Sequence, residues 1–291
     1  MTGITSGVPG LRWRESGLAI LGDELLDRFE ATDRVFAGWA AELGAANRFY
    51  PDLIELSQLN PVRYLQSFPH HATLVTGFRP QPAVFARAGG EYADAATIAV
   101  DESMQAGFTH LLAPAACYHC YPEFAGRQIE RTHLVTMRCT CHRREQAYEP
   151  LRRQWCFRMR EIVCLGDAKS VATFAEDARQ WLDRLIVELG LEARWATAMD
   201  PFFDCENDPK ALAQRVAPSK QELRLADGLA IASVNEHRTF FGDAYGIRTC
   251  SGAAWSACVA FGLERWLWAF LDRFGPRVST WPALPCPKAI S

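Results

Sequence analysis

Two short cysteine clusters are the first residues in this sequence that could bind a metal. Two residues separate Cys117 from Cys120, and one residue separates Cys139 from Cys141, which His142 follows directly. Four thiolates could form a closed tetrahedral zinc site, although on a straight strand Cys139 and Cys141 would share one face. The alternatives are isolated buried cysteines or a mixed site with an open position, whose ligands come from separate strands.

The stretch 137–165 predicts a β-hairpin that gathers chemically useful side chains on one face. Two strand-like runs flank a polar loop, and strand side chains alternate between two faces. An arginine, two acids and an aromatic ring would then face one shared space. The alternative is an ordinary hairpin with a solvated polar face. The side chains in question are Arg143, Glu145, Phe157, Met159 and Glu161.

Arg265 follows Gly262 where a strand gives way to a helix, in the sequence Gly-Leu-Glu-Arg. The helix dipole disfavours a cation in a first turn, so this arginine hints at a function. The alternative is a surface arginine bonded to a nearby acid.

The histidines show no pairing with a serine or cysteine nucleophile in the sequence. A Cys–His hydrolase remains an alternative, because such partners need only be close in space.

The composition describes a globular protein of one large or two small domains. The 291 residues are 49% apolar and 22% charged, with a net charge of -3, which argues against a protein that mainly neutralises nucleic-acid phosphates. No apolar run approaches the roughly 20 residues that span a bilayer. The N-terminal residues lack the basic start and apolar stretch of a signal peptide, so we expect a cytoplasmic protein.

Apolar spacing predicts the elements that position these residues. Because the strands are joined by hairpins, we expect an α+β fold, an antiparallel sheet with helices packed on one side. The expected elements are a loose lead-in over 1–20, long helices over 23–45 and 168–189, short helices within 79–105 and over 208–216, a buried strand from 109, strands over 222–225 and 230–235, and a strand and helix over 254–274.

The hairpin and the last segment resemble two signatures of class II aminoacyl-tRNA synthetases. Motif 2 reads His142-Arg143-Arg144-Glu145 and then Phe157-Arg-Met-Arg-Glu161, and motif 3 reads Ala260-Phe-Gly262-Leu-Glu264-Arg265. His142 replaces the usual aromatic residue, and Ala260 replaces the first glycine. Ser233-Val-Asn235 is similar to the Ser-x-Asn strand of seryl-tRNA synthetases.

Over roughly residues 65 to 275 the chain resembles most closely the seryl-tRNA-synthetase-like family of amino acid:[carrier protein] ligases. The resemblance implies one class II catalytic domain over 1–291. Residues 1–48 would be a lead-in and helix, and 200–220 an insertion. No long heptad run is present, so we expect no tRNA-binding arm.

The family implies a zinc ion held by Cys117, Glu161 and Cys258, with Cys120 as a competitor for Cys117. Three protein ligands leave a fourth position for the substrate amino group. The remaining implied roles concern ATP and Mg²⁺. Arg143 would bind the α-phosphate and the attacking carboxylate, Glu145 the adenine amino group, Phe157 the adenine ring and Arg265 the γ-phosphate, while Glu222 and Asn235 would contact magnesium, nucleotide or substrate.

The implied activity joins a small amino acid, glycine rather than alanine, to the phosphopantetheine thiol of an acidic carrier protein through an aminoacyl-adenylate. Lys210, Arg215 and Lys220 offer a candidate docking helix, and an ordinary solvated helix is the alternative. A homodimer is expected, with 49–75 as the candidate motif 1. A truncated seryl-type aminoacyl-tRNA synthetase and a non-catalytic synthetase-like binding subunit remain as alternatives.

Overall fold

A seven-stranded sheet carries the candidate residues. The computed structural model describes residues 7–98 and 101–285. Every neighbouring pair in the sheet is antiparallel except β3 with β7, so the predicted α+β architecture is confirmed with one parallel edge pair. In spatial order the strands are β3 (Ala46–Arg48), β7 (His133–His142), β8 (Cys156–Gly166), β14 (Trp255–Gly262), β11 (Ala230–Arg238), β10 (Lys220–Leu225) and β9 (Ala193–Ala198).

The predicted hairpin is formed by β7 and β8, with Met137 opposite Glu161. Strand β7 ends at His142, one residue before the expected arginine. The prediction that Arg143 and Glu145 share one face of a strand is therefore wrong. Both lie in the connecting loop, although the Arg143 backbone N–H still donates to the Trp155 carbonyl oxygen over 2.9 Å.

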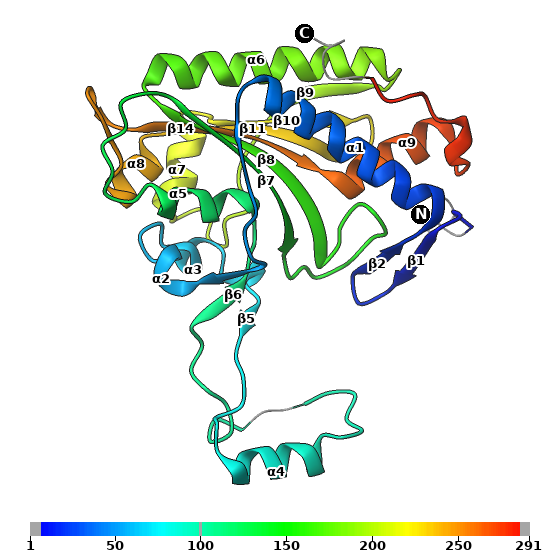
Figure 1. Cartoon of the computed structure of the whole chain (residues 1–291), viewed down its shortest axis with the longest axis vertical. Helices are drawn as coiled ribbons and strands as arrows, with labels where there is room; N and C mark the ends of the chain where they lie inside the picture. Colours follow the sequence, from blue (N-terminus) through cyan, green and yellow to red (C-terminus); the bar gives the residue numbers. More distant parts are fainter. Residues whose placement is uncertain (1–6, 99–100, 286–291) are drawn as a thin grey trace.

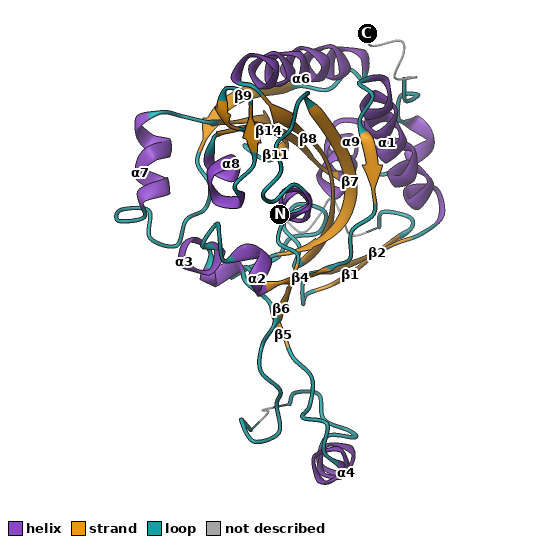
Figure 2. Ribbon diagram, turned by 60° about the vertical axis from the view of Figure 1, so that its left-hand side comes forward, coloured by secondary structure: helices purple, strands orange, loops and turns teal. Residues whose placement is uncertain are grey.

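Three long helices cover one face of the sheet, as Figures 1 and 2 show. Their apolar stripes meet the strands in one core, where the rings of Phe36 and Phe261 stack with centroids 4.0 Å apart. Asp167 caps the first turn of α6 (Ala168–Glu188) by accepting a hydrogen bond from the Ser170 backbone N–H. The helices are α1 (Asp23–Glu42), α6 (Ala168–Glu188) and α9 (Leu263–Phe274).

The opposite face is covered by short elements and holds a second core, which includes Tyr121, Phe241 and Val163. Helices therefore lie on both faces, whereas the sequence predicted one covered side. The short helices are α2 (Leu56–Leu59), α3 (Tyr64–Ser67), α5 (Cys120–Glu123), α7 (Pro209–Val216), α8 (Phe240–Tyr245) and the 3₁₀ turns Pro69–His71, Ala116–His119 and Val278–Thr280. A two-stranded ribbon, β12 (Arg248–Thr249) with β13 (Gly252–Ala253), follows α8.

Residues 1–20 were expected to form a loose lead-in, and this is wrong for the part described. Strands β1 (Leu11–Arg14) and β2 (Leu18–Leu21) form a hairpin, and residues 1–6 lie outside the described residues. Leu11 and Leu21 pack on the main core and Val8 is buried in it. Apolar side chains thus anchor the hairpin to the body.

A three-stranded sheet leads out of the body toward a helix at its far end (Figures 1 and 2). Strand β6 (His110–Leu112) pairs with both β4 (Leu53–Glu55) and β5 (Leu74–Val75). The chain between β5 and β6 extends away and carries α4 (Pro82–Glu91), the short helix expected within 79–105. Strand β6 then runs into the cysteine-rich turn, as the sequence predicted.

Candidate active site

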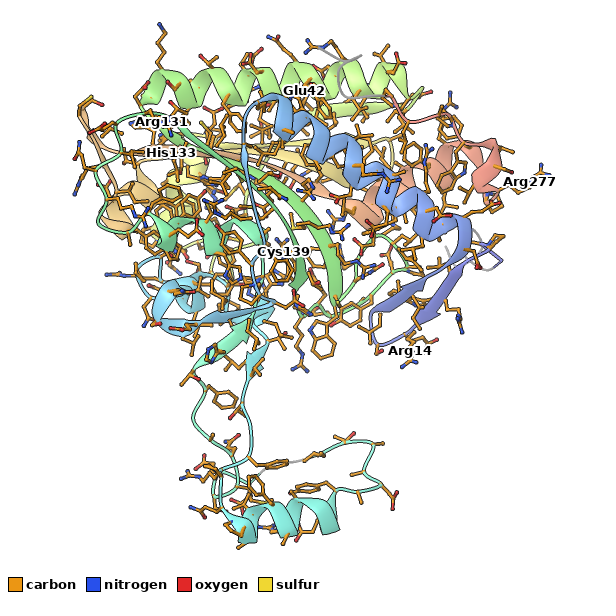
Figure 3. The ribbon with its side chains drawn as sticks, viewed as in Figure 1. Arg14, Glu42, Arg131, His133, Cys139 and Arg277 are labelled. Carbon is orange, nitrogen blue, oxygen red and sulfur yellow. The ribbon has the colours of Figure 1, made fainter. Side chains whose placement is uncertain are left out.

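A cavity of about 380 Å³ opens on the sheet face that carries the short helices. Ile162 and Val259 pack in the core with α1, α6 and α9. Because strand side chains alternate, their neighbours Glu161 and Cys258 point to the other face and line the cavity. The stick view in Figure 3 labels Cys139 on β7, the strand beside the one that carries Glu161.

Three side chains at the inner end of this cavity could hold a metal. Each of Cys117, Glu161 and Cys258 offers a ligand atom, and these atoms all lie within 4.8 Å of one another. All three residues are buried. Cys117 comes from the 3₁₀ turn, while Glu161 and Cys258 come from the paired strands β8 and β14. Within residues 7–98 and 101–285, no other three residues of these types reach such spacing.

The Glu161 carboxylate is only half satisfied by protein donors. Its Oε1 accepts from the Ala116 backbone N–H over 3.0 Å, while its Oε2 is buried without a hydrogen-bond partner among the described residues. Burial raises the pKa of Glu161 to about 7. A buried carboxylate oxygen without a donor is destabilising unless a cation or proton meets it, and two thiols and a carboxylate suit Zn²⁺.

Cys117 and Cys258 differ in their surroundings. A hydrogen bond donated by Cys117, with the nearby His237, lowers the pKa of the Cys258 thiol. The same hydrogen bond and burial raise the pKa of Cys117. Asn235 donates its side-chain amide to the Cys258 sulfur over 3.4 Å, and His237 Nε2 lies 3.8 Å from that sulfur. Cys258 therefore has the more anionic character of the two thiols.

The closed four-cysteine arrangement is not formed. No three of the thiols Cys117, Cys120, Cys139 and Cys141 come within ligand reach in the described part of the chain. Cys139 and Cys141 lie on β7 opposite Met159 and Phe157 of β8, and both cysteines are buried in the second core. Burial raises the pKa of Cys120 and Cys139, as expected for thiols that stay protonated.

Arg143 and Phe157 lie face to face on one wall of the cavity. The Arg143 guanidinium carbon is 5.4 Å from the Phe157 ring centroid, and its Nε donates to the Pro114 carbonyl oxygen over 2.9 Å. Its Nη2 lies 4.0 Å from the Met159 sulfur, and the side chain lines the cavity. The Glu145 carboxylate lines the same cavity and lies 3.9 Å from His71 Nδ1.

Arg265 is held by two carbonyl oxygens rather than by an acid. Its Nε donates to Arg152 over 2.9 Å and its Nη1 to Ala230 over 3.0 Å. Burial, with the charge of Arg143 nearby, lowers the pKa of Arg265 to about 10. The acid beside it in sequence, Glu264, instead binds Arg158. Neither Arg143 nor Arg265 has a carboxylate partner within residues 7–98 and 101–285, and two neighbouring guanidinium groups of this kind favour an anionic ligand.

Two relatives decide the family of this chain. It is 34% identical over 259 residues to amino acid–[acyl-carrier-protein] ligase 1 of Bradyrhizobium diazoefficiens, an alignment that covers 83% of this chain and 76% of that one. Ligase 2 of the same organism is 33% identical over 250 residues, which cover 80% and 71%. The chain belongs to the amino acid–[acyl-carrier-protein] ligase family. The resemblance seen in the sequence is therefore confirmed, and so is a ligase enzyme. No protein-family model matches the chain.

More distant relatives share the fold of this ligase. A type-2 serine–tRNA ligase of Methanococcus maripaludis is 25% identical over 260 residues, and the chain spans 50% of that enzyme's length. The crystal structure of M. kandleri SerRS in complex with A. aeolicus tRNASec superposes with a TM-score of 0.80 at 19% identity, covering 95% of this chain and 57% of that one. The cytoplasmic serine–tRNA ligase of Naegleria fowleri in complex with AMP gives 0.70 at 13%, covering 99% and 57%. The expected class II synthetase fold is confirmed.

The basic docking set predicted for this ligase is wrong for two of its three residues. Lys220 lies in the cavity wall, where its Nζ is 2.9 Å from Asp200 Oδ1 and 3.4 Å from Glu222 Oε1. The Lys210 ammonium donates to the Val62 carbonyl oxygen over 2.9 Å and also faces the cavity. Of the three, Arg215 alone is exposed. Helix α7 thus presents Lys210 inward, where its ammonium also donates to Ser67 Oγ at the end of α3.

Glu222 and Asn235 both line the cavity but have protein partners. Glu222 binds Arg224 Nη2 over 2.7 Å in addition to Lys220. Asn235 bonds to Ser233 and to the Cys258 sulfur, which places it beside the candidate metal ligand.

His237 was missed by the sequence reasoning. It follows Asn235 by two residues on β11, so the period of a strand would have selected it. Its ring lies near Tyr121, Ser256 and the Cys258 sulfur.

No described helix in this ligase is long and apolar enough to cross a membrane.

Proposed function

We propose that this ligase activates a small amino acid with ATP and transfers it to the phosphopantetheine thiol of a carrier protein. The observation that carries the proposal is one cavity with a Cys–Glu–Cys cluster beside two arginines. Such a site pairs a group that can bind an amine with groups that can bind phosphates. The two relatives that are amino acid–[acyl-carrier-protein] ligases support this activity.

Cys117, Glu161 and Cys258 would hold a zinc ion. The donor set and the unpartnered Oε2 of Glu161 fit that metal. When bound, zinc supplies a Lewis-acidic position for the amino group of the substrate. Asn235 and His237 would hold the Cys258 sulfur in place from the side of β11.

ATP would occupy the part of the cavity lined by the arginines. Arg143 would bind the α-phosphate and the attacking carboxylate, Arg265 the γ-phosphate, and Phe157 would stack on the adenine. Glu145 would accept from the adenine amino group. Glu222, between Lys220 and Arg224, would contact Mg²⁺ or the nucleotide. Two enzymes of similar fold bind such nucleotides, a serine–tRNA ligase in complex with AMP and a prolyl-tRNA synthetase in complex with AMPPNP.

The first chemical step would be an in-line displacement at the α-phosphorus. A carboxylate oxygen of the amino acid forms the new P–O bond, and the bond to the oxygen bridging the α- and β-phosphates breaks to release pyrophosphate. The carboxylate is already ionised, so no general base is required. Arg143 and Arg265 would stabilise the charge that develops on the phosphates.

In the second step the phosphopantetheine sulfur would attack the acyl carbon of the adenylate. The C–S bond forms, the C–O bond to the phosphate breaks, and AMP leaves while the thiol proton passes to solvent. The product is an aminoacyl thioester. The exposed Arg215 on α7 would guide an acidic carrier protein toward the cavity.

We propose glycine, rather than alanine, as the amino acid. Tyr118, Met159 and Phe241 line the cavity that also contains Cys258, so bulky side chains reduce the space for a substrate side chain. One methyl group changes binding by only about 1–3 kcal/mol, so the preference over alanine would be modest.

We also propose a homodimer, as is usual for class II enzymes. The candidate motif 1 at 49–75 is a series of short pieces rather than a helix followed by a strand. Helix α1 and strand β3, followed by Pro51, fit that description better.

ATP–pyrophosphate exchange with each amino acid tests the activation step, and transfer assays with phosphopantetheinylated carrier protein and with tRNA test the acceptor. We expect exchange with glycine, weaker exchange with alanine and label on the carrier protein only. Charging of tRNA would instead support the synthetase alternative. Absence of exchange with every amino acid would leave the binding-subunit alternative.

A further inference from the structure

The turn of the N-terminal hairpin, Glu15–Gly17, contacts the loop that follows β7. The Trp155 backbone N–H donates to the Gly17 carbonyl oxygen over 3.0 Å. Figure 1 shows the hairpin beside that loop, and Figure 3 labels Arg14 at the start of the turn. The first strands of the chain therefore touch the connection between the two strands of the candidate nucleotide site.

Only glycine fits at position 17. Its φ of +87° lies in the left-handed region, and a Cβ would lie 2.8 Å from Tyr148 Cγ and 2.9 Å from the Trp155 nitrogen. The Tyr148 and Trp155 rings are nearly parallel, with an interplanar angle of 4° and centroids 6.4 Å apart. The glycine thus allows a close approach between the hairpin and both aromatic residues.

Tyr148 contacts Glu145 as well as the hairpin. The Glu145 backbone N–H donates to the Tyr148 hydroxyl oxygen over 3.3 Å. On its other side the Glu145 carboxylate lies 3.9 Å from His71 Nδ1. Trp155 is fixed in turn, because its Nε1 donates to Thr73 Oγ1 over 3.0 Å and its carbonyl oxygen accepts from the Arg143 backbone.

We propose that Gly17 and Tyr148 are positioning residues for base selection, which hold Glu145 where its carboxylate meets the adenine amino group. The inference rests on the proposed function, in which Glu145 accepts from that amino group. Guanine carries a carbonyl at the same ring position and would meet the carboxylate with a repulsive oxygen. A displaced Glu145 would lose the advantage of adenine, whereas contacts to the phosphates would persist.

The test compares ATP with purine riboside triphosphate, which lacks the 6-amino group. Equilibrium binding of both nucleotides is measured alongside pyrophosphate exchange for the wild type, Tyr148→Phe and Gly17→Ala. In Tyr148→Phe one neutral hydrogen bond is lost, so we expect the ATP-to-analogue affinity ratio to fall about threefold to tenfold. Gly17→Ala should lower the ratio as well and speed amide exchange at Glu145 and Trp155.

Gly44→Ala is the matched control, because Gly44 has a φ of +73° but open space around a Cβ. It should leave the ratio at the wild-type value. A purely structural role for the hairpin would weaken both nucleotides equally, and an unchanged ratio in Tyr148→Phe and Gly17→Ala would overturn the inference. Wild-type protein that prefers ATP in binding but shows no exchange would overturn the proposed function alone.

Discussion

The side-chain amide of Asn235 donates a hydrogen bond to the Cys258 sulfur over 3.4 Å, across the paired strands β11 and β14. The contact stabilises negative charge on that sulfur and fixes the orientation of its ligand atom. Asn235 therefore contacts one of the three residues of the candidate metal cluster.

Asn235→Ala should weaken zinc binding by about 10- to 100-fold, because outer partners of metal ligands contribute about that much. Competition with a chromogenic chelator measures the affinity. Asn207→Ala is the control, since that side chain is exposed and bonds to Asp204. If the variant keeps its zinc affinity but binds ATP more weakly, Asn235 contacts the nucleotide rather than supporting the metal ligand.

The three proposed ligands should each be required for zinc. Cys117→Ser, Glu161→Gln and Cys258→Ser should reduce zinc affinity by more than the roughly 10–100-fold expected for an outer partner. Metal content after dialysis and chelator competition measure this. Cys120→Ser should retain zinc, because that thiol lies outside the cluster. Zinc retained by Glu161→Gln and lost by Cys120→Ser would contradict the assignment.

Arg143→Ala should lower the rate constant for pyrophosphate exchange by about 100- to 1,000-fold, the usual effect of removing one charge-stabilising group. The adjacent Arg144→Ala is the matched control, because Arg144 is exposed and does not line the cavity. Equal losses in the two variants would show that the effect is general rather than specific to the site.

Asp200→Asn should lower the free energy of unfolding at pH 7 by about 1 kcal/mol, a modest value because its side chain is 37% exposed. Burial alone would raise the pKa of Asp200, but the Lys220 ammonium prevails and lowers it. The stabilisation is therefore present above the ordinary aspartate pKa of about 3.9 and disappears as the pH falls through the lowered value.

Denaturant unfolding at several pH values checks this, with the exposed Asp177→Asn as control. The difference between wild type and Asp200→Asn should vanish in acid, where both side chains are neutral. A difference that stays constant down to pH 2 would rule out the ion pair as its cause.

Arg215→Glu should slow transfer to the carrier protein by about tenfold while pyrophosphate exchange keeps its rate, since the exposed charge affects encounter rather than chemistry. Arg194→Glu, on the exposed part of β9, changes the net charge equally and should leave both steps unchanged. Parallel loss of both steps in Arg215→Glu would contradict a docking role.

Local periodicity determined much of the fold in advance. The stripe of apolar residues that forms α6 repeats every 3.6 residues, so its helix needed no knowledge of the sheet. The β7–β8 hairpin and the strand-to-helix transition at Gly262 were likewise predicted, because turn residues and alternation act over a few positions. The family resemblance could also be seen in the sequence, because motif 2 and motif 3 are short stretches that follow each other in the expected order.

Tertiary structure alone decided which side chains meet. The sequence did not distinguish Cys117 from Cys120 as a metal ligand, because both belong to one short cluster. In the structure the 3₁₀ turn places only Cys117 close to Glu161 and Cys258. Lys220 looked like a surface cation, yet a sheet position opposite Asn235 buries it against Asp200. Strand register and the packing of distant segments set these distances, and neither is encoded in any short stretch of sequence.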